Sequence, residues 1–273
     1  MQTIEYTDSK VLYGRGSLPL MIVRNQYGKA VIAIQGAQLL EYTRNDGREF
    51  LWLSDTAVFE PGRAIRGGIP ICLPWFGPKE GKPQHGFARN WDWQVREGET
   101  VFDFDRRSED FDWHFGASLA MDFSEHLRLT LSVTNQDKTP MPLSWALHSY
   151  HPVADIRRTV IQGLEGATFR DNTRNRQIFI QSGAVEFTGE TDRAFLQVGD
   201  SQNIEGAFTV SAKNAASAVV WNPGAELADK MADLSDYRSF VCLERGNVLD
   251  DQIMLSAGET HTAVVEIQAL EAD

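Results

Sequence analysis

Two side chains capable of proton transfer stand out in this sequence, His148 in LHSY and Glu244 in VCLE. In PLSWALHSY, period-two alternation puts the leucines and the tryptophan on one strand face, so His148 points to the other face. Glu244 ends a run that is apolar on both faces, where a carboxylate needs polar partners. Both side chains could act as general acid or base. Each also has a structural explanation, as a hydrogen-bonded histidine or as a strand-end carboxylate paired with Arg245.

A second candidate is the long segment RGGIPICLPWFGPKEGKPQHGFARNWDW, residues 66–93, which has neither helical nor strand periodicity. An ordered loop of this length is usually functional. Between residues 61 and 91, five basic residues stand against Glu80 alone, a local net charge of +4 in a chain of net charge −12. The basic residues are Arg63, Arg66, Lys79, Lys82 and Arg89. The segment could capture a small anion, although an ordinary solvated loop would have the same composition.

The sequence lacks the common signatures of cofactor and nucleophile chemistry. It contains no G-x-G-x-x-G, G-x-x-x-x-G-K-[ST], G-x-S-x-G or C-x-x-C. His148 and His151 are three residues apart in an expected strand, so they should point to opposite faces and not share a metal. We therefore expect no metal and no cofactor, and acid–base chemistry by side chains alone.

Charge and composition restrict the partners. A protein of pI about 5.0 repels nucleic acid and anionic membrane surfaces. The N-terminal MQTIEYTDSK has no signal-peptide pattern, and no apolar run approaches the ~20 residues of a membrane span. Cys72 and Cys242 lie in apolar runs, as expected of buried thiols in a reducing compartment. We expect a cytoplasmic monomer that binds a small molecule, with no nucleic acid or membrane partner.

The elements that must position these residues are mostly strands. HLRLTLSVTN alternates apolar and polar residues, which is typical of a strand with one buried face. Only NPGAELADKMADL, residues 222–234, has helical spacing. Further β patterns occur in AVIAI, EFLWLS, DWQV, PLSWALHSY, QIFIQ, AVEFTG, SAVVWN, SFVCLE and TAVVEIQAL. Many short strands with very little helix predict an all-β fold, a large antiparallel β-sandwich forming one domain over residues 1–273.

Five motifs in order resemble a known family. RGGIP, PWFGP, QHGFAR, LHSY and VCLE together are similar to the hexose-6-phosphate mutarotases, or glucose-6-phosphate 1-epimerases, of the aldose 1-epimerase superfamily. The resemblance implies a galactose-mutarotase-like β-supersandwich. It also implies an isomerase that interconverts the α and β anomers of a sugar phosphate without a cofactor.

The resemblance also implies roles for individual residues. It makes His148 the catalytic acid and Glu244 the catalytic base. Substrate contacts are expected at Arg66 in RGGIP, at Gln84, His85 and Arg89 in QHGFAR, and at Asp192 in GETDRAF. One departure is His151, because relatives commonly carry an aromatic residue there, and it makes the local pocket wall uncertain.

The arginines explain how such a site could hold a phosphate. Arg66 and Arg89, with Arg63 or Lys82 nearby, could clamp the phosphate because guanidinium groups bind it in bidentate fashion. Aromatic residues of the segment, Trp75, Phe76 and Phe87, could form walls for the sugar or belong to the core. The alternatives are a mutarotase of a neutral aldose such as galactose or glucose, and a noncatalytic sugar-binding protein of the same fold. A sugar hydrolase or lyase fits less well, because hydrolysis normally uses two carboxylates.

Overall fold

Two large antiparallel sheets form the body of the molecule. The structure is a computed structural model, and it describes residues 2–270. In spatial order, the eight-stranded sheet contains β15 (Gln177–Ile180), β14 (Thr168–Asp171), β17 (Thr191–Leu196), β20 (Ser217–Asn222), β21 (Phe240–Asn247), β11 (Trp145–Leu147) and β5 (Ile71–Cys72), with β12 (Tyr150–Pro152) also paired to β21. The nine-stranded sheet contains β16 (Val185–Glu186), β13 (Val160–Gln162), β18 (Ser201–Ile204), β19 (Phe208–Lys213), β23 (Thr260–Ala269), β9 (Leu127–Asn135), β8 (Phe115–Phe123), β7 (Val101–Asp105) and β6 (Gln94–Val95).

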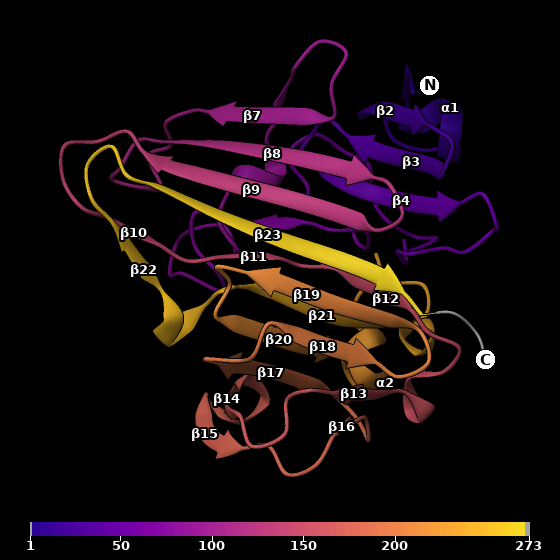
Figure 1. The fold of residues 1–273 in the computed structure, drawn as a ribbon, viewed down its shortest axis with the longest axis vertical. Coiled ribbons are helices and arrows are strands. Elements are labelled where there is room, and N and C mark those ends of the chain that lie inside the picture. Colours follow the sequence, from indigo (N-terminus) through magenta and orange to yellow (C-terminus); the bar gives the residue numbers. More distant parts are fainter. Residues whose placement is uncertain (1, 271–273) are drawn as a thin grey trace.

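The two sheets pack face to face. Figure 1 shows β19 and β18 of the nine-stranded sheet in front of β21 and β20 of the eight-stranded sheet. Leu131 of β9 and Leu243 of β21 belong to one large buried apolar cluster, which places the core between the sheets. The opposite face of the eight-stranded sheet is therefore free to form a site, and the predicted all-β sandwich is confirmed.

Two smaller sheets and a few short helices complete the fold. The four-stranded sheet consists of β1 (Thr3–Asp8), β2 (Pro19–Arg24), β3 (Gly28–Ala33) and β4 (Gln38–Arg44), and the two-stranded sheet of β10 (Met141–Leu143) and β22 (Ile253–Leu255). The helices are α1 (Ser9–Tyr13), α2 (Gly224–Ala228) and the 3₁₀ turns η1 (Ala88–Asn90), η2 (Ile156–Arg158), η3 (Asn172–Arg174), η4 (Tyr237–Ser239) and η5 (Leu249–Asp251). Among residues 2–270, no helix is long and apolar enough to cross a membrane.

The structure corrects two local expectations. Residues 49–54, EFLWLS, do not form a strand, because their backbone changes partner: the amide of Phe50 donates to Tyr42 and that of Trp52 donates to Tyr150. The helix expected over residues 222–234 ends at Ala228. Beyond it, the chain turns so that the amide of Ser235 donates to the Ser54 hydroxyl, a contact that a continuing helix could not make.

The long aperiodic segment is largely buried and folds back on itself. Its regular parts are only β5 and η1. The amide of Leu73 donates to the His85 carbonyl and the amide of Phe87 donates back to Leu73, so residues 73–87 form a closed loop. This closure holds His85 beside the sheet that carries His148.

Candidate active site

Strand β21 is the scaffold of the site. Pairing aligns Tyr150 of β12, Cys242 of β21, Trp221 of β20 and Asp192 of β17 in one row across the sheet. The expected strand PLSWALHSY is interrupted, and His148 lies between β11 and β12. Because Leu147 is paired with Arg245 and Tyr150 with Cys242, His148 stands opposite Glu244. Both rows lie on the face that points away from the core.

The apolar run had indicated that Glu244 ends its strand, but the strand continues beyond it. Strand β21 continues to Asn247, and Arg245 points to the other face. There the Arg245 guanidinium donates to the carbonyls of Ser217, Asp200, Gly199 and Ala215 and to the side chain of Gln202. Arg245 therefore fixes the backbone on the far side of β21, and it does not pair with Glu244.

His148 and Glu244 form a close buried pair. Nε2 of His148 lies 3.3 Å from Oε1 of Glu244. The other two polar atoms of the pair, His148 Nδ1 and Glu244 Oε2, are buried and have no hydrogen-bond partner among the described residues. Such atoms are costly in a protein interior unless something else binds them.

Burial drives both members of the pair toward their neutral forms. It raises the pKa of Glu244 well above its ordinary value, and the nearby Asp192 adds to that rise. It lowers the pKa of His148 well below its ordinary value, and the proximity of His85 and the charges of Arg89 and Arg66 lower it further. The pair is therefore stable with a net charge of zero, holding one exchangeable proton between its facing atoms.

His85 presents a fixed tautomer to the same cavity. The amide of Gly77 donates to its Nδ1 at 3.1 Å, so in the neutral ring Nε2 carries the hydrogen. Burial, with Arg89 and Arg66 nearby, lowers the pKa of His85 to about 3, so the ring is neutral at physiological pH. The ring lies 5.8 Å from that of His148.

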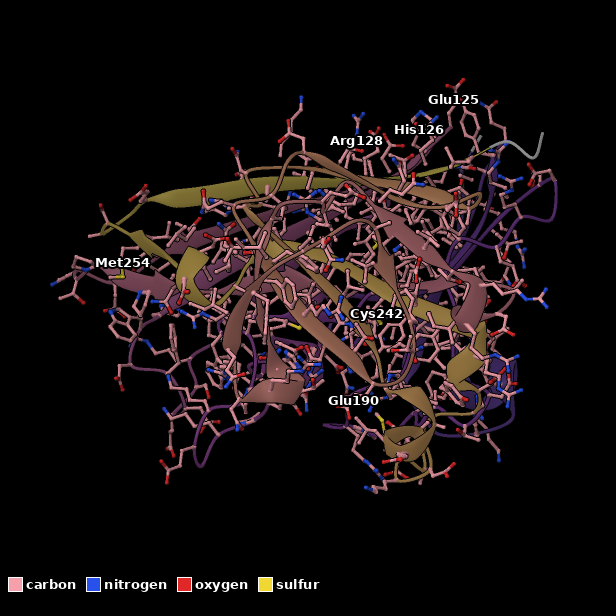
Figure 2. All side chains as sticks on the ribbon, turned by 90° about the horizontal axis from the view of Figure 1, so that it is seen from below. Glu125, His126, Arg128, Glu190, Cys242 and Met254 are labelled. Carbon is pink, nitrogen blue, oxygen red and sulfur yellow. The ribbon has the colours of Figure 1, made fainter. Side chains whose placement is uncertain are left out.

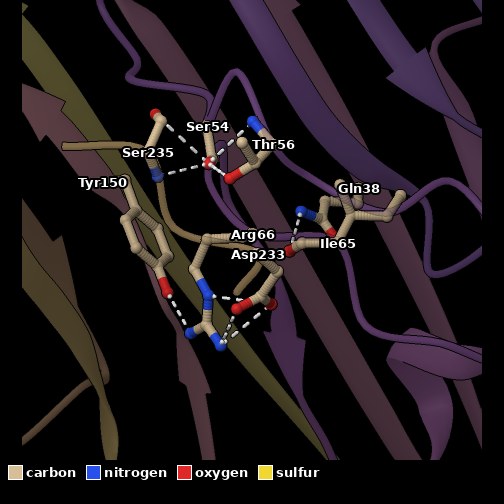
Figure 3. Close-up of polar contacts among 8 residues, drawn as sticks. All are labelled: Gln38, Ser54, Thr56, Ile65, Arg66, Tyr150, Asp233 and Ser235. Atoms are coloured by element: carbon tan, nitrogen blue, oxygen red, sulfur yellow. Dashed lines mark hydrogen bonds and ion pairs between the residues drawn. The ribbon is translucent and has the colours of Figure 1, made fainter. Parts of the chain in front are cut away.

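Arg66 reaches the cavity already paired. Its Nε donates to Asp233 at 3.2 Å, its Nη2 donates to the second oxygen of the same carboxylate, and its Nη1 donates to the Tyr150 hydroxyl (Figure 3). The guanidinium also lies over the ring of Trp221. The segment that carries Asp233 is attached through Ser235 to Ser54, as Figure 3 also shows.

Asp192 is positioned on β17 beside Trp221. Asn172 donates to its carboxylate at 2.7 Å. Burial raises the pKa of Asp192 to about 6, against the effect of that hydrogen bond. The carboxyl group is thus able to accept from, or donate to, a sugar hydroxyl near neutral pH.

The other cations of the aperiodic segment do not gather around Arg66. Arg63 pairs with Glu60 at the surface, Lys79 lies over the ring of Trp75, and Lys82 donates to the Asp110 carbonyl. Arg89 does not line the cavity, and its guanidinium donates to the backbone carbonyl of Gln84. The proposed +4 cluster is therefore dispersed, and Arg89 supports the loop that carries Gln84 and His85.

The aromatic residues of the segment divide between wall and core. Phe76 lines the cavity, whereas Trp75 and Phe87 are packed in the main core. His151 also lies in the core, where Nε2 contacts Ser149 and the ring packs against Phe208. His151 is thus no part of the cavity wall, and it points away from His148 as predicted.

These side chains surround one cavity of about 670 Å³, a volume suited to a small ligand. Its lining residues are Arg66, Phe76, Gly77, Pro78, Gln84, His85, His148, Asn172, Asn175, Arg176, Glu190, Asp192, Val219, Trp221, Leu227, Met231, Glu244 and Leu249. Figure 2 shows Glu190, one of these residues, on the opposite side of the molecule from Arg128 of β9. The cavity therefore opens on the outer face of the eight-stranded sheet.

Comparison with known proteins agrees with this geometry. The family model described as aldose 1-epimerase matches residues 19–268. The chain belongs to the aldose 1-epimerase family. It is therefore an isomerase that acts on carbohydrate, and its sandwich is the fold of galactose mutarotase-like proteins.

This epimerase is similar to curated proteins that are provisionally named glucose-6-phosphate 1-epimerase. One from Cenchrus ciliaris is 32% identical over 88% of this chain and 81% of the relative. Another, from Escherichia coli K12, is 31% identical over 90% of this chain and 89% of the relative. The crystal structure of YeaD from Salmonella typhimurium, provisionally called a mutarotase, superimposes with a TM-score of 0.82 at 29% identity, covering 93% and 91% of the two chains.

Several residues of the site, two of them in the cavity lining, were not expected from the sequence. Tyr150 and Asp233 hold Arg66, Asn172 holds Asp192, and Trp221 forms the wall between them. Alternation in SAVVWN does place Trp221 on one face of its strand. The neighbouring strands, and therefore the side chains that Trp221 contacts, depend on long-range strand pairing. The alternation pattern does not contain that information.

Proposed function

We propose that this epimerase interconverts the α and β anomers of a hexose 6-phosphate, with glucose 6-phosphate as the preferred substrate. The observation that carries the proposal is the His148–Glu244 pair, 3.3 Å apart, buried and facing the cavity. Its two unpartnered polar atoms need hydrogen-bond partners, and a sugar can supply them at the anomeric hydroxyl and the ring oxygen. The relatives' provisional names support the choice of a phosphorylated hexose.

Anomer exchange needs one proton removed and one added. With the exchangeable proton of the pair on His148, Glu244 takes the proton of the C1 hydroxyl while His148 gives its proton to the ring oxygen O5, and the C1–O5 bond breaks to give the open-chain aldehyde. Rotation about the C1–C2 bond then exposes the other face of the carbonyl. The same two groups act in reverse as O5 attacks C1: His148 takes back the proton of the C5 hydroxyl, and Glu244 returns its proton to the carbonyl oxygen, which becomes the C1 hydroxyl. Each positioned group contributes roughly 10² to 10⁴ in rate.

A pair of net charge zero suits this cycle. Ring opening moves one proton onto Glu244 and one off His148, so the total held by the pair is unchanged in the aldehyde complex. Because the number of protons on the pair stays the same, the reaction creates no net charge in the protein interior, where a charge would be costly. Substrate contacts are assigned to Arg66, Gln84, His85 and Asp192, all of which line the cavity. Arg89 acts from behind them through the Gln84 carbonyl.

A neutral aldose is the second candidate substrate, and the pairing of Arg66 favours it. The Arg66 charge is already compensated by Asp233, and the acidic residues Glu190 and Asp192 also line the cavity. A site built in this way could hold the hydroxyls of glucose or galactose without a phosphate. The preference between the two substrate classes therefore needs a direct measurement.

Magnetization-exchange NMR on equilibrated anomers tests the proposal. We expect the protein to accelerate exchange of glucose 6-phosphate with a higher kcat/KM than for glucose or galactose. The Glu244→Gln variant should lose at least about 10² in rate, whereas Glu186→Gln, an exposed residue of the other sheet, should retain parent activity. Absence of acceleration with every sugar would refute the activity. A higher kcat/KM for a neutral sugar would replace glucose 6-phosphate by that sugar as the proposed substrate.

A further inference from the structure

Arg176 is a cavity-lining arginine whose guanidinium has no ion-pair partner among residues 2–270. Arg66, the other arginine of the lining, is bonded to Asp233 and Tyr150. For Arg176, no carboxylate oxygen among residues 2–270 lies within 4.0 Å of the guanidinium, and the guanidinium makes no hydrogen bond to those residues. A guanidinium is always charged and offers several donors in a planar fork, so an anion in the cavity would meet its strongest partner here.

The backbone holds Arg176 in place although its side chain is exposed. Asn175 and Arg176 have φ values of 53° and 60°, a left-handed conformation that is uncommon for residues other than glycine. The amide of Arg176 donates to the Asp171 carbonyl at 2.8 Å, and its own carbonyl accepts from the Arg170 side chain at 3.3 Å. Two consecutive residues of this type persist where the surroundings fix them, and such conformations cluster at ligand sites.

The position of Arg176 suits the far end of a hexose. Its Nη2 lies 3.8 Å from the point where a side chain on Gly77 would begin, and the Gly77 amide is bonded to His85, whose ring faces His148. Gly77 and His85 thus stand between Arg176 and the acid–base pair. A sugar with C1 at that pair could extend past His85 and Gly77 toward Arg176.

Acidic residues restrict where the anion can lie. Glu190 and Asp192 also line the cavity and would repel a phosphate placed directly against them, although Arg176 is near enough to Asp192 to lower the pKa of that carboxyl. The sugar hydroxyls therefore fit the Asp192 side, and the phosphate fits the side between Gly77 and Arg176.

We propose that Arg176 recognises the phosphate of the substrate and sets the preference for a phosphorylated over a neutral sugar. Arg66, compensated by Asp233, then contacts sugar hydroxyls and serves both substrate classes. This inference rests on the proposed function, because it assigns one group of the same substrate. It replaces the expectation that Arg66 and Arg89 form the phosphate clamp.

The test compares Arg176→Ala and Arg176→Lys with the parent and with Arg174→Ala. Arg174 is a matched control two residues away: it is exposed, stacks over Phe179, pairs with Asp171 at 3.7 Å and does not line the cavity. The measured quantity is the ratio of kcat/KM for glucose 6-phosphate to that for glucose. We expect Arg176→Ala to lower this ratio roughly ten- to a hundredfold, the effect of losing a charge-assisted contact. Lysine should restore part of it, and Arg174→Ala should leave it at the parent value.

Inorganic phosphate gives a second readout. It should inhibit the parent competitively against glucose 6-phosphate, and the inhibition constant should rise by a similar factor in Arg176→Ala. A parent enzyme that does not prefer the phosphorylated sugar would contradict the proposed function and this inference together. A parent preference that survives in Arg176→Ala would overturn this inference alone, and so would equal losses on both sugars.

Discussion

The decisive feature among the individual residues is that His148 and Glu244 form a buried pair with a net charge of zero. Either member can hold the exchangeable proton, so the pair has an acid and a base in both directions of the reaction. Anomer exchange is nearly symmetric and needs this reversibility. The apparent pKa values observed in kinetics belong to the pair and not to one residue.

The pH dependence of kcat/KM follows from the same pair. A second proton would leave a net positive charge beside Arg66 and Arg89, and burial already lowers the pKa of His148, so the acid limb should lie below the ordinary histidine value of about 6.5. Loss of the last proton leaves a buried negative charge, and burial raises the pKa of Glu244, so the alkaline limb should lie above the ordinary glutamate value. We expect a bell-shaped profile with its plateau near neutral pH.

The His148→Asn variant checks that assignment. With one titrating group removed, the residual activity should follow a single ionisation and lose one limb of the bell. Initial rates of anomer exchange between pH 4 and 10 would measure this. A bell with both limbs unchanged in that variant would remove His148 from the mechanism, and His85 would be the next residue to test.

At the scale of elements, the closed loop of residues 73–87 delivers His85 to the site, and Gly86 makes the loop possible. Gly86 has φ 72°, and a Cβ added there would stand 2.0 Å from the Leu73 carbonyl oxygen. No side chain can be accommodated at that distance without moving the backbone. The neighbouring His85 would move with it.

Replacing Gly86 by alanine should therefore impair both stability and activity. Gly81 is the matched control, because it also has positive φ, 68°, but has no atom within 4 Å of an added Cβ. Gly81→Ala should cost about 1 kcal/mol of unfolding free energy from backbone strain alone. Gly86→Ala should cost several times more and lower kcat/KM at least about tenfold. Urea unfolding and exchange rates measure both effects, and equal costs for the two variants would contradict the collision.

The pairing of the strands also determines which parts of the site could be predicted from the sequence. Period two correctly placed His148 opposite the apolar face of its segment and His151 on the core side, because strand geometry fixes that alternation. It could not bring Asp192 near Glu244, since that depends on β17, β20 and β21 pairing in order. The alternation also could not show that the Arg89 guanidinium donates to a backbone carbonyl. Nor could it show that Arg176, in a polar turn, lines the cavity.

At the scale of the whole molecule, the sandwich separates two kinds of buried polar group. The outer face of the eight-stranded sheet holds groups whose burial serves the cavity. The space between the sheets holds His151, whose ring contacts Ser149 and Phe208 and reaches no ligand. Its titration therefore affects the stability of the fold rather than the chemistry of the site.

The stability of the protein should fall in mild acid, and His151 should account for part of the loss. Burial lowers the pKa of His151 to about 4, below the value of about 6.5 expected in the unfolded chain. Between these values the unfolded state binds more protons, so the stability contribution is complete above pH 6.5 and is lost as the pH falls toward 4. Asp192 acts in the opposite direction, because its pKa is raised to about 6 and the folded state binds its proton more readily. The contribution of His151 must therefore be isolated by comparison with a variant.

His151→Phe provides that comparison, since a phenyl ring of similar shape can pack against Phe208 without titrating. On lowering the pH from 7.5 to 5, the parent should lose about 2 kcal/mol more unfolding free energy than the variant, because pH 5 lies about 1.5 units below the unfolded-state pKa and each unit corresponds to about 1.4 kcal/mol. Urea unfolding at the two pH values measures the difference, with equal m-values showing that the same transition is followed. If the two proteins lose equal stability, protonation of His151 does not oppose folding, and the acid sensitivity is then assigned to His85, His148 and His261, whose pKa values burial also lowers.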